Sequence, residues 1–449
     1  MEHKTIQDYL ETVAQQMRWK RARPVVIAEL KQHLEDQRDT FATEGYENAE
    51  QLAVEEMGDP VMVGTELDCI HRPKPQYGLL LFTILFALIG VLLRVWLTAS
   101  WEPYNMNIDP QRTVLAWMIG VGALLCGYFL DYARLGLYGR MVYVVALVIS
   151  VGTLMWSPRI MGASYYTRYI TLLFPVVYAF WLYTCRRKGW IGLLLALAGG
   201  IPLPVICLQA PYLFGLLTLL LTGFVLLVAA AWSDWFGIGR RNTLLFVMFC
   251  TIGMVAITFL SVFSSGYASE RLNILLHPEL EPLGRGYQAC MIQEVLGASQ
   301  WFGEGMREGS QYPFELQVPG CDSDAFLTTL IYKLGWLPFL LLVLLFVLLV
   351  VWLLYRCIHQ KSQLGKWVVL SVVSTLSMQA LCSVTWNLGF TFYDSSFPLI
   401  VGNLNMIINM WMIGLALSVF RAENIARDDL RNKIPSLPRY HIKIELQKY

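Results

Sequence analysis

Long apolar runs constrain this chain more than any other feature of its sequence. A bilayer core of about 30 Å is crossed by a helix of about 20 apolar residues. Only 15% of the residues are charged, whereas a soluble domain carries about 25%. The sequence therefore predicts an all-α, polytopic membrane protein with about ten transmembrane helices. The apolar runs lie at about 78–99, 113–131, 138–156, 168–185, 190–207, 212–232, 243–263, 325–355, 366–386 and 399–420.

The first 75 residues differ from the rest in charge and pattern. They hold 9 Lys/Arg against 15 Asp/Glu, a net charge of −6, which disfavours binding to nucleic acid or anionic lipid. Thr5 and Asp8 form a helix-capping signal, and Pro24 suits a first helical turn. We therefore expect a small helical domain over 1–75, a membrane domain over 76–421 and a tail over 422–449.

Basic residues are distributed unevenly between the short loops, and this indicates orientation. Alternate loops carry most of them: Arg134 and Arg140; Arg186, Arg187 and Lys188; Arg240 and Arg241; and Arg356, Lys361 and Lys366. The intervening short loops hold only Arg112, Arg159 and Arg168. Because Lys and Arg accumulate in cytoplasmic loops, we expect the 1–75 domain and both termini in the cytoplasm and the 264–324 loop outside.

The 264–324 loop is too long for a simple connector, and loops of this length usually carry function or lack order. It contains Pro282-Leu-Gly-Arg-Gly-Tyr-Gln288, aromatic residues and several acids, which indicates partial order. Cys290 and Cys321 belong to this loop. If the loop is extracytoplasmic, a disulfide between them is one alternative and two free thiols the other. We expect the chemistry of the protein in this loop.

Short motifs run through the whole of the 1–75 segment. They are Arg21-Ala-Arg23, Ile27-Ala-Glu-Leu30, His33-Leu-Glu-Asp36, Met57-Gly-Asp-Pro60, Val63-Gly64 and Leu67 to Lys74. Together they resemble the permease prefix domain, also called HAAS, a small helical module that precedes some bacterial membrane proteins. The resemblance implies a regulatory or interaction role for this segment.

Three stretches of the membrane part carry a second resemblance. They are Arg271-Leu272, Pro278, Pro282 to Gln288 and Phe302-Gly-Glu-Gly305; then Ser323-Asp324 to Leu334-Gly335; then Gln379-Ala380, Asn387-Leu-Gly389, Pro398-Leu399 and Ile413 to Val419. In order and spacing they resemble the SEDS family, which includes FtsW, RodA and SpoVE. The resemblance implies a glycosyltransferase of the bacterial cell membrane that polymerises lipid II into peptidoglycan for cell shape, division or sporulation. It also implies a class B penicillin-binding protein as partner.

The chain departs from the family pattern in several places. The family has Gln-Pro-Ser-Glu followed by lysine, where this chain reads Gly162-Ala-Ser-Tyr-Tyr-Thr-Arg168 without a glutamate. Val401-Gly-Asn-Leu-Asn405 replaces Ser-Tyr-Gly-Gly-Ser, Tyr332-Lys333 replaces an acidic pair, and Glu304 stands where lysine is usual. Two functions stay open: a divergent lipid II polymerase, or a non-catalytic scaffold, regulator or lipid-binding transporter in envelope assembly.

The same resemblance implies roles for particular side chains. Asp324 corresponds to a catalytic carboxylate that acts on the acceptor sugar hydroxyl or holds a divalent cation, Mg²⁺ or Mn²⁺. The alternative for Asp324 is a helix N-cap. Arg271 and Arg285 are candidates to bind lipid-linked pyrophosphate, or else ordinary loop arginines that face water. Gln288 and Asn387 are further candidates for substrate binding.

Three other charged residues have two interpretations each. Asp322 is a second carboxylate or a solvated loop acid. Arg94 lies within the first apolar run, where a central arginine costs about 2.5–3.5 kcal/mol, or it reaches the outer headgroups. Lys333, if helical, lies about 13 Å deeper than Asp324. It then faces a polar cavity, or pairs with Asp131 or another acid.

Overall fold

Helices make up almost the whole of this structure, a computed structural model that describes residues 5–20, 22–99, 109–160, 163–210, 212–263, 266–306, 318, 320–321, 323–391 and 395–422. The N-terminal segment, called the prefix below, folds into α1 (Ile6–Gln16), α2 (Arg23–Thr43), α3 (Ala49–Met57) and α4 (Pro60–His71). Thr5 caps α1 by accepting a hydrogen bond from the Asp8 backbone N–H. Pro24 lies in the first turn of α2. Both sequence signals are confirmed.

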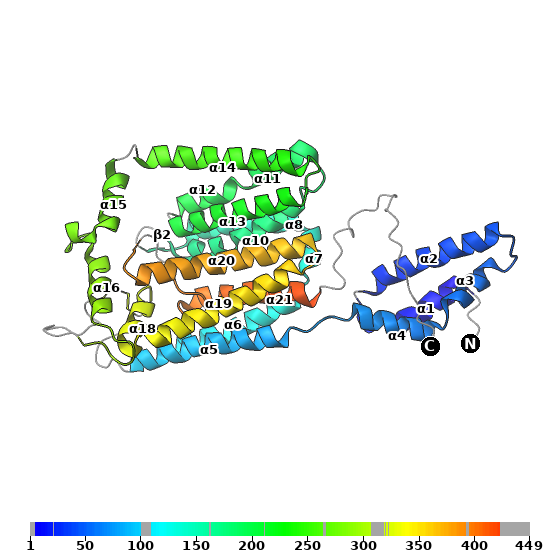
Figure 1. Cartoon of the computed structure of the whole chain (residues 1–449), viewed down its shortest axis with the longest axis horizontal. Coiled ribbons are helices and arrows are strands. Elements are labelled where there is room, and N and C mark those ends of the chain that lie inside the picture. The colour runs from blue at the N-terminus through cyan, green and yellow to red at the C-terminus, as the bar shows by residue number, and fades with distance from the viewer. Residues whose placement is uncertain are drawn as a thin grey trace.

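The prefix has a hydrophobic core of its own. Tyr9, Val13 and Leu34 are fully buried where α1 meets the other prefix helices. The buried carboxylate of Asp68 in α4 accepts hydrogen bonds from the Arg18 backbone N–H and from the Arg72 guanidinium, each 2.8 Å long. These contacts fix α4 against the end of α1, and α1–α4 form a separate unit beside the membrane helices (Figure 1).

The membrane part is a bundle of helices that run roughly side by side (Figure 1). Among the described residues, eight stretches are long and apolar enough to cross a membrane. The other two predicted spans, 168–185 and 243–263, correspond to the segment that includes α10 (Phe174–Tyr183) and to α14 (Arg240–Phe263). The all-α polytopic fold is confirmed. The helices are α5 (Tyr77–Ala99), α6 (Pro110–Phe129), α7 (Tyr132–Leu137), α8 (Gly139–Trp156), α9 (Tyr165–Ile170), α10 (Phe174–Tyr183), α11 (Gly189–Gly199), α12 (Pro202–Gln209), α13 (Leu213–Trp232), α14 (Arg240–Phe263), α18 (Phe326–Leu334), α19 (Trp336–Ile358), α20 (Gln363–Asn387) and α21 (Asn403–Arg421).

Several predicted spans are broken rather than continuous. The 168–185 run contains the end of α9, η1 (Thr171–Leu173) and α10, the 190–207 run divides into α11 and α12, and the 325–355 run divides at Gly335. Gly335 has a φ of +100°, and a Cβ there would lie 2.5 Å from the Trp301 carbonyl oxygen. Because only glycine tolerates both conditions, the sequence forces the break between α18 and α19 at this residue.

Helices α6 and α21 approach each other closely in the bundle. A Cβ on Gly127 would lie 2.5 Å from the Trp411 carbonyl oxygen, and a Cβ on Gly414 would collide with the Leu124 carbonyl oxygen. Small residues let helix backbones approach each other in membranes, where lipid gives no hydrophobic drive to association. These glycines therefore set the distance between α6 and α21.

The two ends of the bundle are structurally distinct. At the prefix end, the Lys74 N–H donates to the carbonyl oxygen of Arg421 (3.2 Å), so the start of α5 and the end of α21 lie together. At the far end, α15 (Gly266–Leu276), η2 (Pro278–Leu280) and α16 (Tyr287–Gly297) cross the bundle (Figure 1). The predicted partial order of the 264–324 loop is confirmed for these segments.

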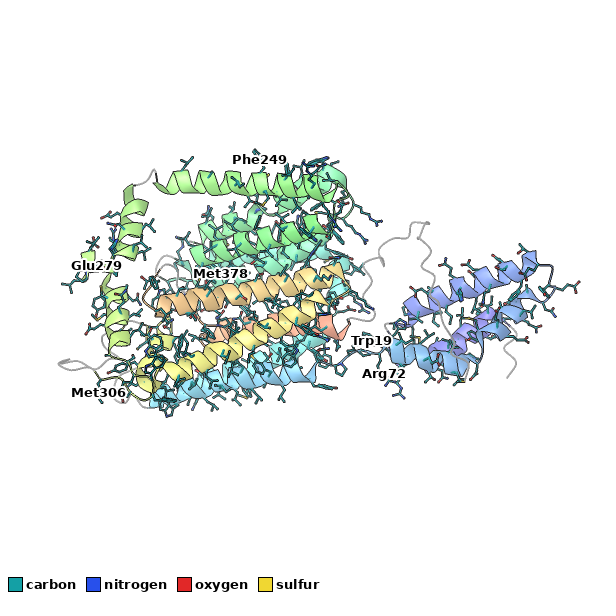
Figure 2. The ribbon with its side chains drawn as sticks, in the orientation of Figure 1. Trp19, Arg72, Phe249, Glu279, Met306 and Met378 are labelled. Atoms are coloured by element: carbon teal, nitrogen blue, oxygen red, sulfur yellow. The ribbon has the colours of Figure 1, made fainter. Side chains whose placement is uncertain are left out.

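Apolar side chains cover the outside of the bundle, as expected for lipid contact. Figure 2 shows Phe249 on α14 pointing away from the other helices, and 76% of it is exposed. Figure 2 also places Arg72 on the prefix side and Glu279 and Met306 at the far end.

Arg94 does not reach toward headgroups: it is only 6% exposed, and its Nη1 donates to Asn403 Oδ1 of α21 at 3.0 Å. The headgroup interpretation of Arg94 is therefore wrong.

Candidate functional site

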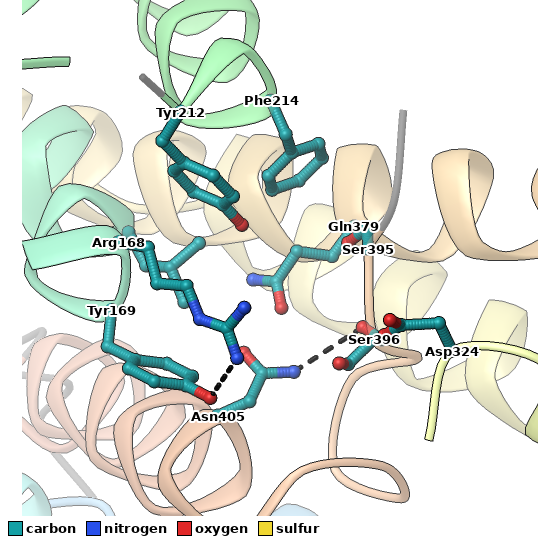
Figure 3. Close-up of a pocket in the computed structure, with 10 residues that line it drawn as sticks. Arg168, Tyr169, Tyr212, Phe214, Asp324, Gln379, Ser395, Ser396 and Asn405 are labelled. Atoms are coloured by element: carbon teal, nitrogen blue, oxygen red, sulfur yellow. Dashed lines mark hydrogen bonds between the residues drawn. The ribbon is translucent and has the colours of Figure 1, made fainter. Parts of the chain in front are cut away.

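A polar pocket lies near the far end of the bundle, where five separate parts of the chain meet (Figure 3). It contains one carboxylate, one guanidinium, two side-chain amides and several hydroxyl groups. Figure 3 shows Arg168 and Asp324 on opposite sides, with Gln379 and Asn405 between them. The lining residues are Arg168, Tyr169, Leu172, Tyr212, Phe214, Asp324, Gln379, Ser395, Ser396 and Asn405.

Asp324 lies in the turn that leads into α18. The N-cap of α18 is Ala325, with no side-chain cap hydrogen bond, so the N-cap interpretation of Asp324 is wrong. Its side chain lines the pocket and is half-buried. Gly320 has a φ of +74° and its carbonyl oxygen accepts hydrogen bonds from the Ser323 and Ala325 N–H groups, which shapes the turn around Asp324. The carboxylate is thus presented to the pocket.

Asn387, at the end of α20, fixes the turn that contains Asp324 by hydrogen bonds on the side away from the pocket. Its Nδ2 donates to the Asp324 carbonyl oxygen and to the Ser383 carbonyl oxygen, each at 2.8 Å. Its Oδ1 accepts from the Thr328 backbone N–H at 2.8 Å and from the Thr328 hydroxyl at 3.0 Å. Asn387 is fully buried. This geometry supports a positioning role for Asn387, one layer behind the pocket lining.

Arg168 is the principal site residue that the sequence analysis did not single out. Its guanidinium carbon lies 5.1 Å and 4.8 Å from the ring centroids of Tyr165 and Tyr169, and its Nη2 donates to the Tyr169 hydroxyl at 2.7 Å. The short hairpin of β1 (Arg159–Ile160) and β2 (Ala163–Ser164) leads directly into this segment. The aromatic residues orient the guanidinium by cation–π contact and hydrogen bonding.

A signal for Arg168 was present in the sequence. It ends the 162–168 segment, where the resemblance implied a glutamate followed by a lysine. The segment lacks the glutamate but keeps a cation at the position of the lysine. In the structure, tyrosine rings flank Arg168, and Asp324 lies across the same pocket.

The wall of the pocket continues into a network of amides inside the bundle. Gln379 of α20 and Asn409 of α21 exchange two hydrogen bonds, each 3.0 Å long. Asn409 also donates to Asn405 Oδ1 at 3.3 Å, and Asn405 donates to the Ser396 carbonyl oxygen at 3.4 Å. Because buried amides without partners are costly, this network fixes α20, α21 and the 395–402 loop relative to one another.

The other candidates from the sequence lie outside the pocket lining. Arg285 is half exposed and pairs with Glu270 at 3.8 Å. Gln288 is half-buried in the first turn of α16. The side chain of Arg271 and the whole of Asp322 fall outside the described residues. Their substrate-binding or solvated roles stay predictions. No disulfide joins Cys290 and Cys321 in this structure.

The pocket offers a limited donor set for a divalent cation. Within the described ranges, no cluster of three or more His, Cys, Asp or Glu side chains is arranged to hold a metal ion. The lining combines the Asp324 carboxylate with neutral amide and hydroxyl oxygens. Mg²⁺ is commonly held by one or two carboxylates together with substrate phosphates. The residues fit a cation that arrives with a phosphorylated ligand.

A bundle of membrane-crossing helices with a carboxylate–guanidinium pocket near one end defines a polytopic membrane protein with a polar ligand site. Residues 77–423 match the FtsW/RodA/SpoVE family of cell cycle proteins, and the chain belongs to this family. The SEDS resemblance is therefore confirmed.

Relatives and solved structures agree with this assignment. The chain is 26% identical over 171 residues to a protein of Trichlorobacter lovleyi and 23% identical over 309 residues to one of Hydrogenovibrio crunogenus, both named probable peptidoglycan glycosyltransferase FtsW. These matches cover 37% and 63% of this chain, and 44% and 74% of the two relatives. The chain thus spans less than half the length of the first relative.

Two solved structures share the fold. One comes from a study of polymerization and crosslinking by a peptidoglycan synthase complex, with a TM-score of 0.58, 18% identity and coverage of 77% of this chain and 98% of that chain. The other is the rod shape determining protein RodA of Thermus thermophilus, with a TM-score of 0.53, 17% identity and coverage of 78% and 97%.

Proposed function

We propose that this protein is a peptidoglycan glycosyltransferase that polymerises lipid II or a related undecaprenyl-linked sugar. The observation that carries the proposal is the placement of Asp324 opposite Arg168 in one pocket (Figure 3). Glycosyl transfer from a lipid diphosphate requires a base near the attacking hydroxyl and positive charge near the departing diphosphate. The names of the curated relatives support the same activity.

The proposed reaction assigns separate roles to the two charged residues. Asp324 accepts the proton of the acceptor sugar hydroxyl while that oxygen forms a bond to the anomeric carbon of the donor. The bond from the anomeric carbon to the diphosphate oxygen breaks, and the lipid diphosphate leaves with the bonding electrons. Arg168 offsets the negative charge that develops on this leaving group, because a guanidinium fork matches phosphate oxygens.

A divalent cation is part of the proposal. Mg²⁺ or Mn²⁺ would neutralise diphosphate charge and stabilise the leaving group. Asp324, with the hydroxyls of Ser395 and Ser396 and the amide oxygen of Asn405, supplies oxygen ligands of the type that such cations prefer. Arg168 across the pocket then holds the diphosphate from its other side.

The proposal places the pocket outside a bacterial cell membrane and the prefix inside. The contact between Lys74 and Arg421 puts the start of the first span and the end of the last at one end of the bundle. The basic residues of the loops favour the cytoplasm for that end.

We also propose that the prefix belongs to the permease prefix class and has a regulatory or interaction role. For crosslinking of the strands, we propose a class B penicillin-binding protein as the partner.

The test is strand polymerisation by the purified full-length protein with labelled lipid II and Mg²⁺ or Mn²⁺. We expect glycan ladders from the wild type and a loss of at least about 100-fold in Asp324→Asn and Arg168→Ala, as for removal of a central catalytic group. Glu279→Gln is the matched control, because Glu279 is an exposed far-end carboxylate outside the pocket lining. Its ladder should equal that of the wild type.

The non-catalytic alternative makes the opposite prediction. A folded wild-type protein that binds lipid II but yields no ladder, with or without a co-purified class B penicillin-binding protein, would identify a scaffold, regulator or lipid-binding transporter. In that case Asp324→Asn should also leave the cellular phenotype intact, while deletion of residues 1–75 should not.

A further inference from the structure

The face of α4 that points away from the prefix core is unusually apolar. On the inner side, Gly64 lies against α1, where an added Cβ would contact Gln16 at 2.8 Å. On the outer side, Met62 and Ile70 are 65% and 61% exposed. We call this side the α4 outer face; its residues are Val61, Met62, Thr65, Glu66, Cys69 and Ile70.

The α4 outer face is continuous along the helix. Met62, Glu66 and Ile70 follow each other at a spacing of four residues, so their side chains lie in one row. Val61 and the exposed thiol of Cys69 extend the apolar surface in the neighbouring row. A helix that is apolar on both sides is normally covered on both sides. A segment that binds this face should therefore supply apolar side chains and a positive charge that pairs with Glu66.

The C-terminal tail leaves the bundle next to α4. The Lys74 N–H, three residues beyond the last residue of α4, donates to the Arg421 carbonyl oxygen at 3.2 Å. The linker is also held by the Gln76 N–H, which donates to the Tyr128 hydroxyl at 3.4 Å. Residues 422–432 span up to about 40 Å when extended, and α4 is about 18 Å long. Residues beyond 432 can thus reach the whole α4 outer face.

Residues 433–449 have the matching composition. They carry Lys433, Arg439, Lys443 and Lys448 against Glu445, a net charge of +3, while the prefix carries 9 Lys/Arg against 15 Asp/Glu, a net of −6. Near their end, Ile442, Ile444 and Leu446 alternate with charged residues. Such alternation gathers the apolar side chains on one side of an extended segment.

We propose that residues 433–449 bind the α4 outer face of the same chain. Ile442, Ile444 and Leu446 cover Met62 and Ile70, and the basic residues surround Glu66. A tether of this length raises the effective concentration of the tail to the millimolar range, so a modest interface suffices. The contact links the prefix to the end of α21, the helix that carries Asn405 at the pocket and Asn409 in the amide network behind it.

Charge argues against two other occupants. The net charge of −6 on the prefix repels the anionic cytoplasmic leaflet, which attracts basic segments. A second copy of the prefix would place two acidic units face to face, and like charges across an interface are costly. The tail combines the apolar groups and the positive charge that the α4 outer face requires.

Thiol crosslinking of the full-length protein tests the proposal. In a chain that keeps Cys69 as its single native cysteine, Ile444→Cys is treated with a short bis-maleimide. We expect a crosslink within one chain, identified by mass spectrometry of the joined peptides. Met62→Asn with Ile70→Asn should slow its formation at least about tenfold, because the two aliphatic contacts are lost while the charge of the face stays unchanged.

Controls separate docking from chance collision and from misfolding. Tyr46→Asn changes a large, mostly apolar side chain that is 54% exposed elsewhere on the prefix, and should leave the crosslinking rate unchanged. Slow hydrogen exchange at the Arg18 amide, which donates to Asp68, reports that each variant keeps the prefix fold. A crosslink between two chains would identify a second copy as the occupant. No crosslink, or an equal rate in the double variant, would show that the tail does not bind this face.

Discussion

Lys333 Nζ and Glu304 Oε1 form an ion pair 2.6 Å long between the last turn of α18 and the 298–306 segment of the far-end loop. Backbone hydrogen bonds flank the pair, from Gly303 N–H to the Leu334 carbonyl oxygen and from Gly305 N–H to the Tyr332 carbonyl oxygen. Both charges are reversed relative to the family pattern. Two departures that look independent in the sequence are thus one compensated contact.

A charge-swap cycle tests this relationship. Lys333→Glu should place two carboxylates together and lower stability by about 1 kcal/mol, with the modest size set by the 60% exposure of Glu304. Adding Glu304→Lys should recover most of that loss, because it restores an ion pair of the opposite polarity. Thermal unfolding of the four proteins in detergent measures the coupling. A double variant no more stable than Lys333→Glu would rule out compensation.

Asn387 should be required for the position of Asp324. Asn387→Ala removes the donor to the Asp324 carbonyl oxygen and the acceptor for the Thr328 backbone N–H. Each buried group left without a partner costs about 1–3 kcal/mol. We expect a clear fall in melting temperature together with a loss of polymerisation that exceeds the loss of folded protein.

Thr328→Val separates these two effects. It removes the Thr328 hydroxyl, which lies 3.0 Å from both the Asn387 carbonyl oxygen and Asn387 Oδ1 and donates its one proton between them, but leaves the bond between Asn387 and Asp324. Stability should fall while activity per folded molecule stays near that of the wild type. Equal activity losses in Thr328→Val and Asn387→Ala would mean that Asn387 acts through stability alone.

A side chain at position 414 should not fit between α6 and α21. Gly414→Ala brings a Cβ onto the Leu124 carbonyl oxygen, a backbone group that cannot move without shifting the helix. Overpacking of this kind costs about 1–3 kcal/mol or more. Gly122→Ala in the same helix pair is the control, since a Cβ there has no atom within 4 Å. Thermal unfolding should show a lower melting temperature for Gly414→Ala and an unchanged one for Gly122→Ala.

Periodic and compositional signals predicted the fold, because a segment that crosses lipid must satisfy its own backbone hydrogen bonds as a helix and present apolar side chains. Thr5, Pro24 and the prefix helices follow from local capping rules in the same way. The pocket depends instead on long-range contacts. Asn387 meets Asp324 across 63 positions of the chain, and sequence order gives no sign of whether its amide faces a substrate or a neighbouring turn.

Arg168 and Arg94 show the same limit for charged residues. Arg168 lines one pocket with Asp324, which is far away in the sequence, and the buried Arg94 donates a hydrogen bond to Asn403 of α21. Hydropathy measures the cost of placing an arginine in the membrane, but it does not reveal which helix supplies the compensating acceptor.

Asp68 should make the stability of the prefix depend on pH. Burial raises the pKa of its carboxyl, but hydrogen bonds from the Arg72 guanidinium and the Arg18 N–H outweigh burial and lower the pKa below its usual range. A lowered pKa in the folded state stabilises the fold above the unfolded value of about 3.9, and this contribution is lost as the pH falls through the folded value. The prefix should therefore be fully stable near neutral pH and weaken in acid.

Hydrogen exchange at the Arg18 amide measures this effect directly, because that amide donates to Asp68. The exchange rate is measured in the full-length protein and corrected for the intrinsic rate at each pH. Asp68→Asn should lower protection near neutral pH and flatten its dependence between neutral and acid conditions. Asp39→Asn is the matched control, since Asp39 pairs with Arg38 at an exposed site and its loss should change little. An unchanged acid profile in Asp68→Asn would assign the pH dependence to other carboxylates of the prefix.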